Sequence, residues 1–440
     1  MHQPIVSSDL AKHLPHPKPE VWGGIECTVN RVQDVYHDQL LRNGHHHRPV
    51  DLMHLADLGL KTLRYPMVWE RTAPHHPDDL DWRWSDERLT LLKQQGIRPI
   101  LGLVHHGSGP GYASFDTPAF EEGLARFARH VAERYPWVED YTPVNEPLTT
   151  ARFAGLYGHW YPHTRSDQSF AQILLRECRA TIKAMQEIRK VQPAARLIQT
   201  DDLGYTHAAA PLTYQADWEN ERRWLTWDLL CGRITPGHAM WDYLRSCGIT
   251  ESELCYFIEN ACPPSVIGVN HYLTSERFLD PNIRNYPEHM HGGNGRHRYV
   301  DTEVVRAAPD QRIGVGGLLL QAWERYHLPL AITEAHLGCT VDEQIRWLME
   351  VWEQVHEART MGADVRAMTV WALLGSYDWH CLVTRCEGYY EPGAFDVRSG
   401  TPVRTPLGDV VQRLALGEPV GSLRPEGPGW WEFVPQSEVA

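Results

Sequence analysis

Two glutamates occupy positions suited to a pair of catalytic carboxylates. Glu146 lies in the segment YTPVNEP, directly after a strand-like run, and Glu334 ends the apolar segment LPLAITE. A charge at the end of an apolar strand has to emerge into a cleft or into solvent, because burying it unpaired is costly. Two carboxyl groups across one cleft can cleave a glycosidic bond: one protonates the departing oxygen, and the other attacks the anomeric carbon or activates water. The alternative for each glutamate is a solvated loop carboxylate.

Further polar and aromatic residues stand at the ends of other strand-like runs. They are Arg64, His105, His106, Asn145, Asn270, His271, Tyr272, His336 and Trp371, the last followed by GSYDW. Arg64 is expected to keep one carboxylate ionised, which would separate the two catalytic roles. Three of the histidines, His106, His271 and His336, could form a zinc site. No short i, i+4 spacing supports that site, so we interpret them as hydrogen-bonding wall residues and expect no metal.

The elements that would position these residues alternate between strands and helices. Apolar residues recur at helical spacing between the strand-like runs, for example at Phe120, Leu124, Phe127 and Val131. Eight such alternations predict a (β/α)₈ TIM barrel with enlarged βα loops, in which catalytic groups sit at the C-terminal ends of the strands. The fourth and seventh strands would then bring Glu146 and Glu334 to opposite walls of one funnel. The strand-like runs are 20–26, 62–69, 98–106, 140–146, 195–203, 265–273, 328–337 and 365–374.

A doubly wound sheet is the main competing fold. It usually carries a glycine-rich phosphate turn after its first strand, and WGGIECTVN contains no GxGxxG pattern. One catalytic domain is the simpler interpretation. We predict an N-terminal arm over 1–18, the barrel domain over 19–417, and an irregular Pro/Gly-rich tail over 418–440.

The amino-acid composition limits the kinds of molecule that the protein is expected to bind. The 42 Lys and Arg against 56 Asp and Glu give a net charge of −14, which argues against nucleic-acid and anionic-membrane binding. No segment approaches the roughly 18–20 apolar residues of a membrane span, and the N-terminus lacks the apolar core of a signal peptide. Nine cysteines without CxxC spacing fit free thiols in a reducing compartment. We therefore predict a cytoplasmic protein that acts on a small molecule without a cofactor; the number of subunits stays open.

The motifs resemble, in order and over nearly the whole chain, those of glycoside hydrolase family 1, a family of retaining β-glycosidases built on a (β/α)₈ barrel. Other families of the clan share a lone NEP, whereas the ordered set is far more specific. The matching segments are EVWGGIECTVN, LRYPMVWERTAP, PILGLVHHGSGP, VNEP, GLYGHWYPH, IGVNHYLTS, LAITEAHLG and VWALLGSYDW.

The resemblance implies a role for each matching residue. Glu146 falls on the acid/base and Glu334 on the nucleophile. The implied sugar-site residues are Asn30 in place of a sugar-binding Gln, Arg64 and Tyr272 beside the nucleophile, His105 on a sugar hydroxyl, Asn145 on the 2-hydroxyl, Trp371 as the floor, and Asp378 and Trp379 on the far hydroxyls.

Departures from the family pattern gather around the same site. They are Asn30 for Gln, His106 for Trp, Pro143 for Thr, His271 for Tyr, Ala335-His336 for Asn-Gly, and Asp378 for Glu. We expect the bond-breaking chemistry to survive in a remodelled sugar pocket. The segment YDWHCLVTR has no lysine for a phosphate group, which disfavours a 6-phosphoglycoside. The alternatives are a transglycosidase on a deoxy or modified sugar and an inactive sugar-binding domain, although a binding domain has no need of both glutamates.

Overall fold

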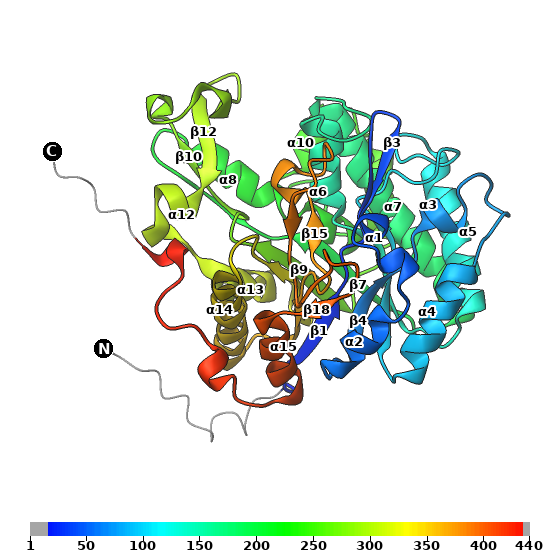
Figure 1. Cartoon of the computed structure of the whole chain (residues 1–440). Helices are drawn as coiled ribbons and strands as arrows, with labels where there is room; N and C mark the ends of the chain where they lie inside the picture. The colour runs from blue at the N-terminus through cyan, green and yellow to red at the C-terminus, as the bar shows by residue number, and fades with distance from the viewer. Residues whose placement is uncertain (1–15, 434–440) are drawn as a thin grey trace.

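Eight parallel strands close into a barrel at the centre of the molecule in the computed structural model, which describes residues 16–433 (Figure 1). Their order around the barrel is β1-β14-β13-β9-β7-β6-β5-β4. Each strand-like run of the sequence contains one of them, so the predicted (β/α)₈ barrel is confirmed. The strands are β1 (Glu20–Gly24), β4 (Thr62–Pro66), β5 (Arg98–His105), β6 (Asp140–Asn145), β7 (Arg196–Asp202), β9 (Val266–Tyr272), β13 (Leu330–His336) and β14 (Val365–Val370).

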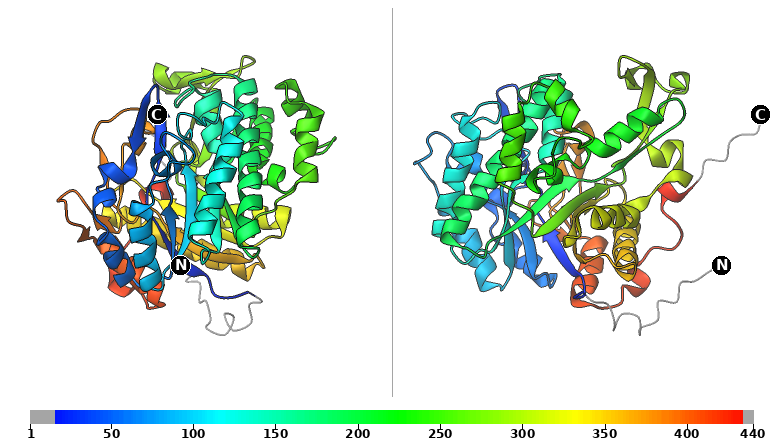
Figure 2. Two further views of the ribbon diagram at one scale, coloured as in Figure 1. Left: turned by 90° about the vertical axis from the view of Figure 1, so that its right-hand side faces the viewer. Right: turned by 180° about the vertical axis from the view of Figure 1, so that it is seen from behind.

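Helices surround the barrel and cover its outer face (Figure 2). The apolar stripe from Phe120 to Val131 lies on α5 (Ala119–Arg134), where all four of its members are buried. Burying such a stripe is the main source of stability for a surface helix, at about 25 cal/mol per Å² of apolar area. The other principal helices are α2 (Asp51–Asp57), α4 (Arg83–Gln94), α7 (Asp167–Val191), α8 (Thr213–Arg222), α9 (Leu225–Leu230), α10 (Trp241–Ser246), α11 (Glu251–Glu259), α13 (Gly314–Tyr326), α14 (Val341–Thr360) and α15 (Pro406–Leu416).

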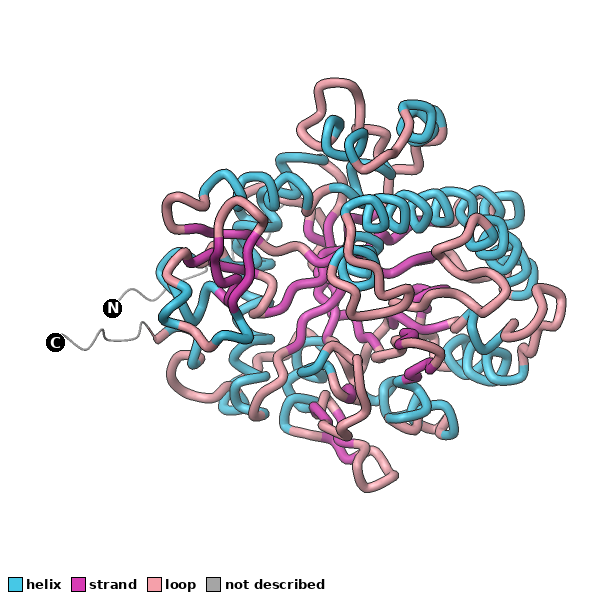
Figure 3. The backbone as a smooth tube through the Cα atoms, turned by 90° about the horizontal axis from the view of Figure 1, so that it is seen from above, coloured by secondary structure: helices cyan, strands magenta, loops and turns pink. Residues whose placement is uncertain are grey.

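The loops that follow the strands carry further sheet structure, and in the view from above they ring the converging strands (Figure 3). A four-stranded sheet of order β11-β12-β10-β8 is built from segments that follow β7 and β9. The small strands are β2 (Val29–Val32), β3 (Val35–Asp38), β8 (Tyr205–Ala208), β10 (Glu276–Asp280), β11 (His291–Gly293), β12 (Arg298–Glu303), β15 (Ser376–Tyr377), β16 (Tyr390–Glu391), β17 (Phe395–Asp396) and β18 (Val403–Arg404).

The inside of the barrel changes from apolar to polar along its axis. Trp22, Ile100, Ile198, Ala331 and Ala367 form a separate apolar cluster toward the starts of their strands. Residues nearer the strand ends are buried polar side chains, among them Thr200, Thr333 and Asn270. Because buried polar groups need hydrogen-bond partners, this upper layer forms a connected network, and the catalytic candidates belong to it.

The segment that follows α15 packs on the outside of the barrel. In the segment 418–433, Trp431 is buried against Trp347 of α14, with 5.7 Å between the ring centroids. Residues 1–15 of the predicted arm and 434–440 of the predicted tail lie outside the described residues, and the division into 1–18, 19–417 and 418–440 stays a prediction. No helix within residues 16–433 is long and apolar enough to cross a membrane.

Candidate active site

Glu146 stands at a sharp turn between strand and helix. It follows β6 directly, its backbone is in the left-handed region at φ 50°, and Pro147 begins the short helix α6 (Pro147–Ala151). A left-handed conformation of a residue other than glycine stores about 1–3 kcal/mol of strain and is most common at functional sites. The turn leaves the side chain buried at the end of the barrel, with the Glu146 N–H donating to the Thr200 carbonyl at 3.2 Å.

Glu334 lies within β13, beside an irregularity in the register between β13 and β9. Its Oε1 accepts a hydrogen bond from Arg64 Nη1 at 2.8 Å, and its Oε2 accepts one from the Tyr272 hydroxyl. Burial raises the pKa of Glu334, while Arg64 and Tyr272 lower it, and the balance brings it to about 7. The charged form of Glu334 is therefore specifically supported by a cation and a hydroxyl donor.

Among the described residues, no lysine or arginine pairs with Glu146 in this way. Its Oε1 accepts a hydrogen bond from Asn270 Nδ2, and its Oε2 lies 3.7 Å from His106 Nε2. Burial raises the pKa of Glu146 well above its ordinary value, and the negative charge of Glu334 raises it further. Of the two carboxyl groups, Glu146 is thus the one that holds a proton near neutral pH.

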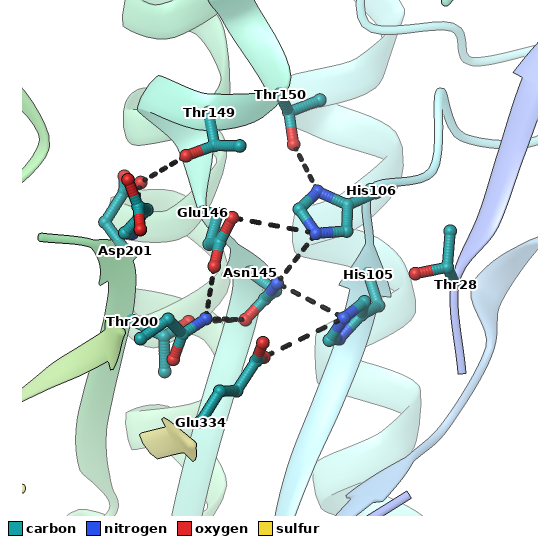
Figure 4. A network of polar contacts seen from close by, with 12 residues as sticks. Thr28, His105, His106, Asn145, Glu146, Thr149, Thr150, Thr200, Asp201 and Glu334 are labelled. Carbon is teal, nitrogen blue, oxygen red and sulfur yellow. Dashed lines mark hydrogen bonds and ion pairs between the residues drawn. The ribbon is translucent and has the colours of Figure 1, made fainter. Parts of the chain in front are cut away.

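Asn145 and Arg64 link the two glutamates. Asn145 Oδ1 accepts from Arg64 Nη2 at 2.8 Å and from Thr200 Oγ1 at 2.7 Å. This fixes the amide so that Nδ2 faces Nε2 of His105 at 3.3 Å and Nε2 of His106 at 3.4 Å (Figure 4). Burial lowers the pKa of both histidines, that of His106 to about 3. Both imidazoles are therefore neutral, with Nε2 as the acceptor.

Trp371 forms one wall of this cluster. Its ring stacks on His105, with 5.3 Å between centroids and an angle of 6°, and the Arg64 guanidinium lies 4.8 Å from its centroid. The indole N–H donates to Glu26 Oε2 at 3.2 Å. These contacts fix the plane of the ring beside the two glutamates; its role as a sugar floor stays a prediction.

Asp378, Trp379 and Asn30, three of the predicted sugar-binding residues, differ in how many of their hydrogen-bonding atoms already have a partner. Asp378 is fully buried and accepts bonds from Arg42 and from the N–H groups of residues 387, 388 and 389. Trp379 lies near His106, with 5.7 Å between the ring centroids. Asn30 donates from Nδ2 to the Val383 carbonyl at 3.1 Å. Direct contact of these three with a sugar stays a prediction.

Three histidines replace other residues of the family pattern: His106, His271 and His336. They do not gather into one site. His106 lies between Glu146 and Thr150, whose Oγ1 is 3.0 Å from its Nδ1. His271 stacks on Trp347 of α14 and pairs with the Leu203 carbonyl, while His336 pairs with Glu391. Our interpretation of all three as wall residues is wrong for His271, because alternate residues of a strand face opposite sides.

Potential metal ligands gather elsewhere. Within residues 16–433, the one group of three His, Cys, Asp or Glu side chains whose ligand atoms lie within 4.8 Å of one another is His380, Cys381 and Glu387. This group lies on the loop after Asp378 and includes none of the three histidines that the zinc alternative invoked.

Sequence reasoning missed a third buried carboxyl group beside the site. Glu26 lies two residues after the end of β1, is 2% exposed, and meets Trp371 through the bond given above. The signal was present in the sequence, because the segment EVWGGIE ends an apolar run with a glutamate just as LPLAITE does.

Known proteins resemble this chain in sequence and in fold. The family model described as "Glycosyl hydrolase family 1" matches residues 18–388. Beta-glucosidase 47 of Arabidopsis thaliana is 22% identical over 439 residues, covering 88% of this chain and 77% of that protein. Phospho-cellobiase of Klebsiella oxytoca is 23% identical over 356 residues, covering 74% of this chain and 75% of that protein. The solved family 1 β-glucosidase of Thermotoga maritima shares the fold, with a TM-score of 0.72 at 17% identity over 91% of this chain and 98% of that one.

Proposed function

The chain belongs to glycosyl hydrolase family 1, and from that premise we propose that this glycoside hydrolase cleaves a β-linked glycoside by double displacement, with Glu334 as nucleophile and Glu146 as acid/base. The observation that carries the assignment is the unequal environment of the two carboxyl groups. Glu334 has Arg64 and Tyr272 on its oxygens, whereas Glu146 has an amide donor and no cation. Glu334 is kept ionised for nucleophilic attack, and Glu146 is kept protonated.

In the first half of the reaction, a Glu334 oxygen attacks the anomeric carbon while Glu146 gives its proton to the departing oxygen. Arg64 orients Glu334 through the bond to Oε1 and keeps it ionised. The bond between the anomeric carbon and the leaving oxygen breaks as the ester bond to Glu334 forms. The leaving group departs as a neutral alcohol, and the negative charge passes from Glu334 to Glu146.

In the second half, Glu146 changes from acid to base. The negative charge of Glu334 raises the pKa of Glu146 in the free enzyme. Ester formation removes that charge, so the pKa of Glu146 falls and its carboxylate can take a proton from water. The water oxygen attacks the anomeric carbon, the ester bond breaks, and the sugar leaves with its original configuration.

The sugar pocket is proposed to differ from that of the named relatives at its far edge. We assign the 2-hydroxyl to Asn145, a further hydroxyl to His105, the ring floor to Trp371, and flanking contacts to Asn30 and Trp379. A β-glucoside is the first substrate to test, since relatives carry the names beta-glucosidase and 6-phospho-beta-glucosidase. An unphosphorylated sugar is favoured because the loop after Asp378 offers no lysine, and Arg385 there already pairs with Glu387.

A mechanism-based label tests the proposal directly. We expect a 2-deoxy-2-fluoro β-glycoside with a good leaving group to inactivate the enzyme and to remain covalently attached to Glu334, as found by mass spectrometry of peptides. Proton NMR of early product should show the β-anomer. An α-anomer would contradict retention, and an unlabelled chain that still binds sugar would favour the inactive binding domain. A labelled enzyme that releases a new glycoside would instead be a transglycosidase.

A further inference from the structure

Glu26 is bonded into the wall of the proposed active site and has no part in the mechanism above. Its Oε1 accepts the backbone N–H of Thr28 at 2.8 Å, and its Oε2 accepts the indole N–H of Trp371. Its charge contributes to raising the pKa of both Glu334 and Tyr272, which places it within electrostatic reach of the nucleophile. A carboxyl group this deeply buried is destabilising unless a partner or a function compensates for it.

Polar atoms near Glu26 are incompletely hydrogen-bonded. The Thr28 hydroxyl, Asn30 Oδ1 and the indole N–H of Trp379 are buried and make no well-formed hydrogen bond among residues 16–433. Burial raises the pKa of Glu26, and the side chains of Thr28 and Trp379 lie close enough to its carboxyl group to offset part of that rise. In Figure 4 the Thr28 hydroxyl points toward His105, which stacks on Trp371. Such atoms are rare in folded proteins, and a cluster of them beside an active site indicates that a ligand supplies the missing partners.

The carboxylate expected at this edge is engaged elsewhere. Asp378 takes its bonds from Arg42 and from three consecutive backbone N–H groups, and these interactions lower its pKa. Its backbone is left-handed at φ 59°, which fits a residue that closes a loop. To reach a sugar hydroxyl, Asp378 would have to give up the loop that it holds.

We propose that Glu26, just after the first barrel strand, binds the sugar hydroxyls remote from the anomeric carbon and replaces Asp378 in that role. This rests on the proposed function. The oxygens of Glu26 are acceptors and the indole N–H of Trp379 close to them is a donor, which suits neighbouring hydroxyl groups that donate one hydrogen bond and accept another. A phosphate or carboxylate at this edge would face the carboxyl group of Glu26, which disfavours an anionic group there. The substrate class is therefore a neutral glycone hydroxylated at its far edge.

The test compares a parent glycoside with its deoxy analogues. The parent is the nitrophenyl β-glycoside that the wild type cleaves fastest, and the analogues lack the 3-, 4- or 6-hydroxyl. For Glu26→Gln we expect kcat/KM on the parent to fall about 10- to 100-fold, the range for a hydrogen bond to a charged group. On the analogue that lacks the bound hydroxyl, the same substitution should lower kcat/KM less than 3-fold, because the contact is already missing.

Asp378→Asn is the matched comparison, and it decides between the two acids. We expect it to lower kcat/KM by one common factor on parent and analogues, since it loosens the loop without removing a sugar contact. Equal losses for Glu26→Gln on all substrates, or selective losses for Asp378→Asn, would overturn the proposal. If Glu26→Gln does not fold, Glu26→Asp keeps the charge with a shorter reach, and the same selective loss is expected.

Two further results separate this inference from the proposed function. The 6-phosphorylated parent should be cleaved at least 100-fold less efficiently than the parent; equal or better cleavage would contradict a neutral glycone. Labelling of Glu334 by the 2-fluoro glycoside should persist in Glu26→Gln, at a lower rate. Labelling of Glu334 with uniform losses across the analogues would overturn only the role of Glu26, whereas an unlabelled wild type would overturn the mechanism itself.

Discussion

Glu334 and Glu146 are the same residue type at the same end of the barrel, and 2% and 4% of their surface is exposed. Their neighbours are what differ. Glu334 contacts a guanidinium and a phenol, while Glu146 contacts an amide and lies near a neutral imidazole. Burial alone would raise both pKa values together, so the division of labour comes from a few contacts contributed by other strands. The proposed catalytic role of each glutamate therefore depends on the side chains around it and not on its residue type or its degree of burial.

Removing Glu334 should produce the largest effect. We expect Glu334→Gly to lower kcat by on the order of 10⁴-fold or more, because the covalent step loses its nucleophile. Azide in the vacated space should restore turnover of an activated aryl glycoside and give the α-glycosyl azide, since it attacks opposite to the leaving group. Reaction rates and NMR of the product check this. Undiminished turnover without azide would contradict the assignment.

Removing Glu146 should lower kcat less than removing Glu334 does. The glycosyl azide formed by this variant should have the opposite anomeric configuration. We expect Glu146→Gly to lower kcat about 10²- to 10⁴-fold on glycosides with poor leaving groups, because general acid assistance is lost. Activated aryl glycosides should be affected less in the first step. Azide should then intercept the sugar bound to Glu334 and give the β-glycosyl azide. An α-azide from this variant would show that the two roles are reversed.

The smallest effect concerns stability. Burial raises the pKa of Glu334 from 4.5 to about 7, so between these pH values the folded chain binds more protons than the unfolded chain. The stability that this group contributes therefore falls as pH rises through that window. We expect Glu334→Gln to gain a few °C in Tm relative to wild type at pH 8 and less at pH 5.

Thermal unfolding at both pH values measures this difference. The exposed Glu259 at the end of α11 provides the control, since Glu259→Gln should shift Tm by the same small amount at each pH. A gain for Glu334→Gln that is larger at pH 5 than at pH 8 would contradict the direction of the pKa shift.

The fold could be predicted, and so could the meeting of Glu146 and Glu334 at one end of the barrel, because these signals are local. Apolar runs mark the strands, and a glutamate at the end of such a run marks a wall of the site. The fate of Asp378 could not be predicted, because its partners are Arg42 and backbone groups nine to eleven residues along the chain. The outward turn of His271 follows from strand alternation once its inward-facing neighbour Asn270 is known. The partners of Asp378 and the orientation of His271 both depend on contacts that form only when the barrel closes.

The way Asp378 holds its loop has a consequence for how such a pocket can diversify. Three of its four bonds go to main-chain N–H groups, which every residue except proline provides. The hydrogen bonds of Asp378 therefore depend on the backbone path of residues 379–389 and not on their side chains. Those residues can be exchanged as one cassette, together with the histidine, the cysteines and the aromatic rings they carry, while the barrel below and its two glutamates remain as they are.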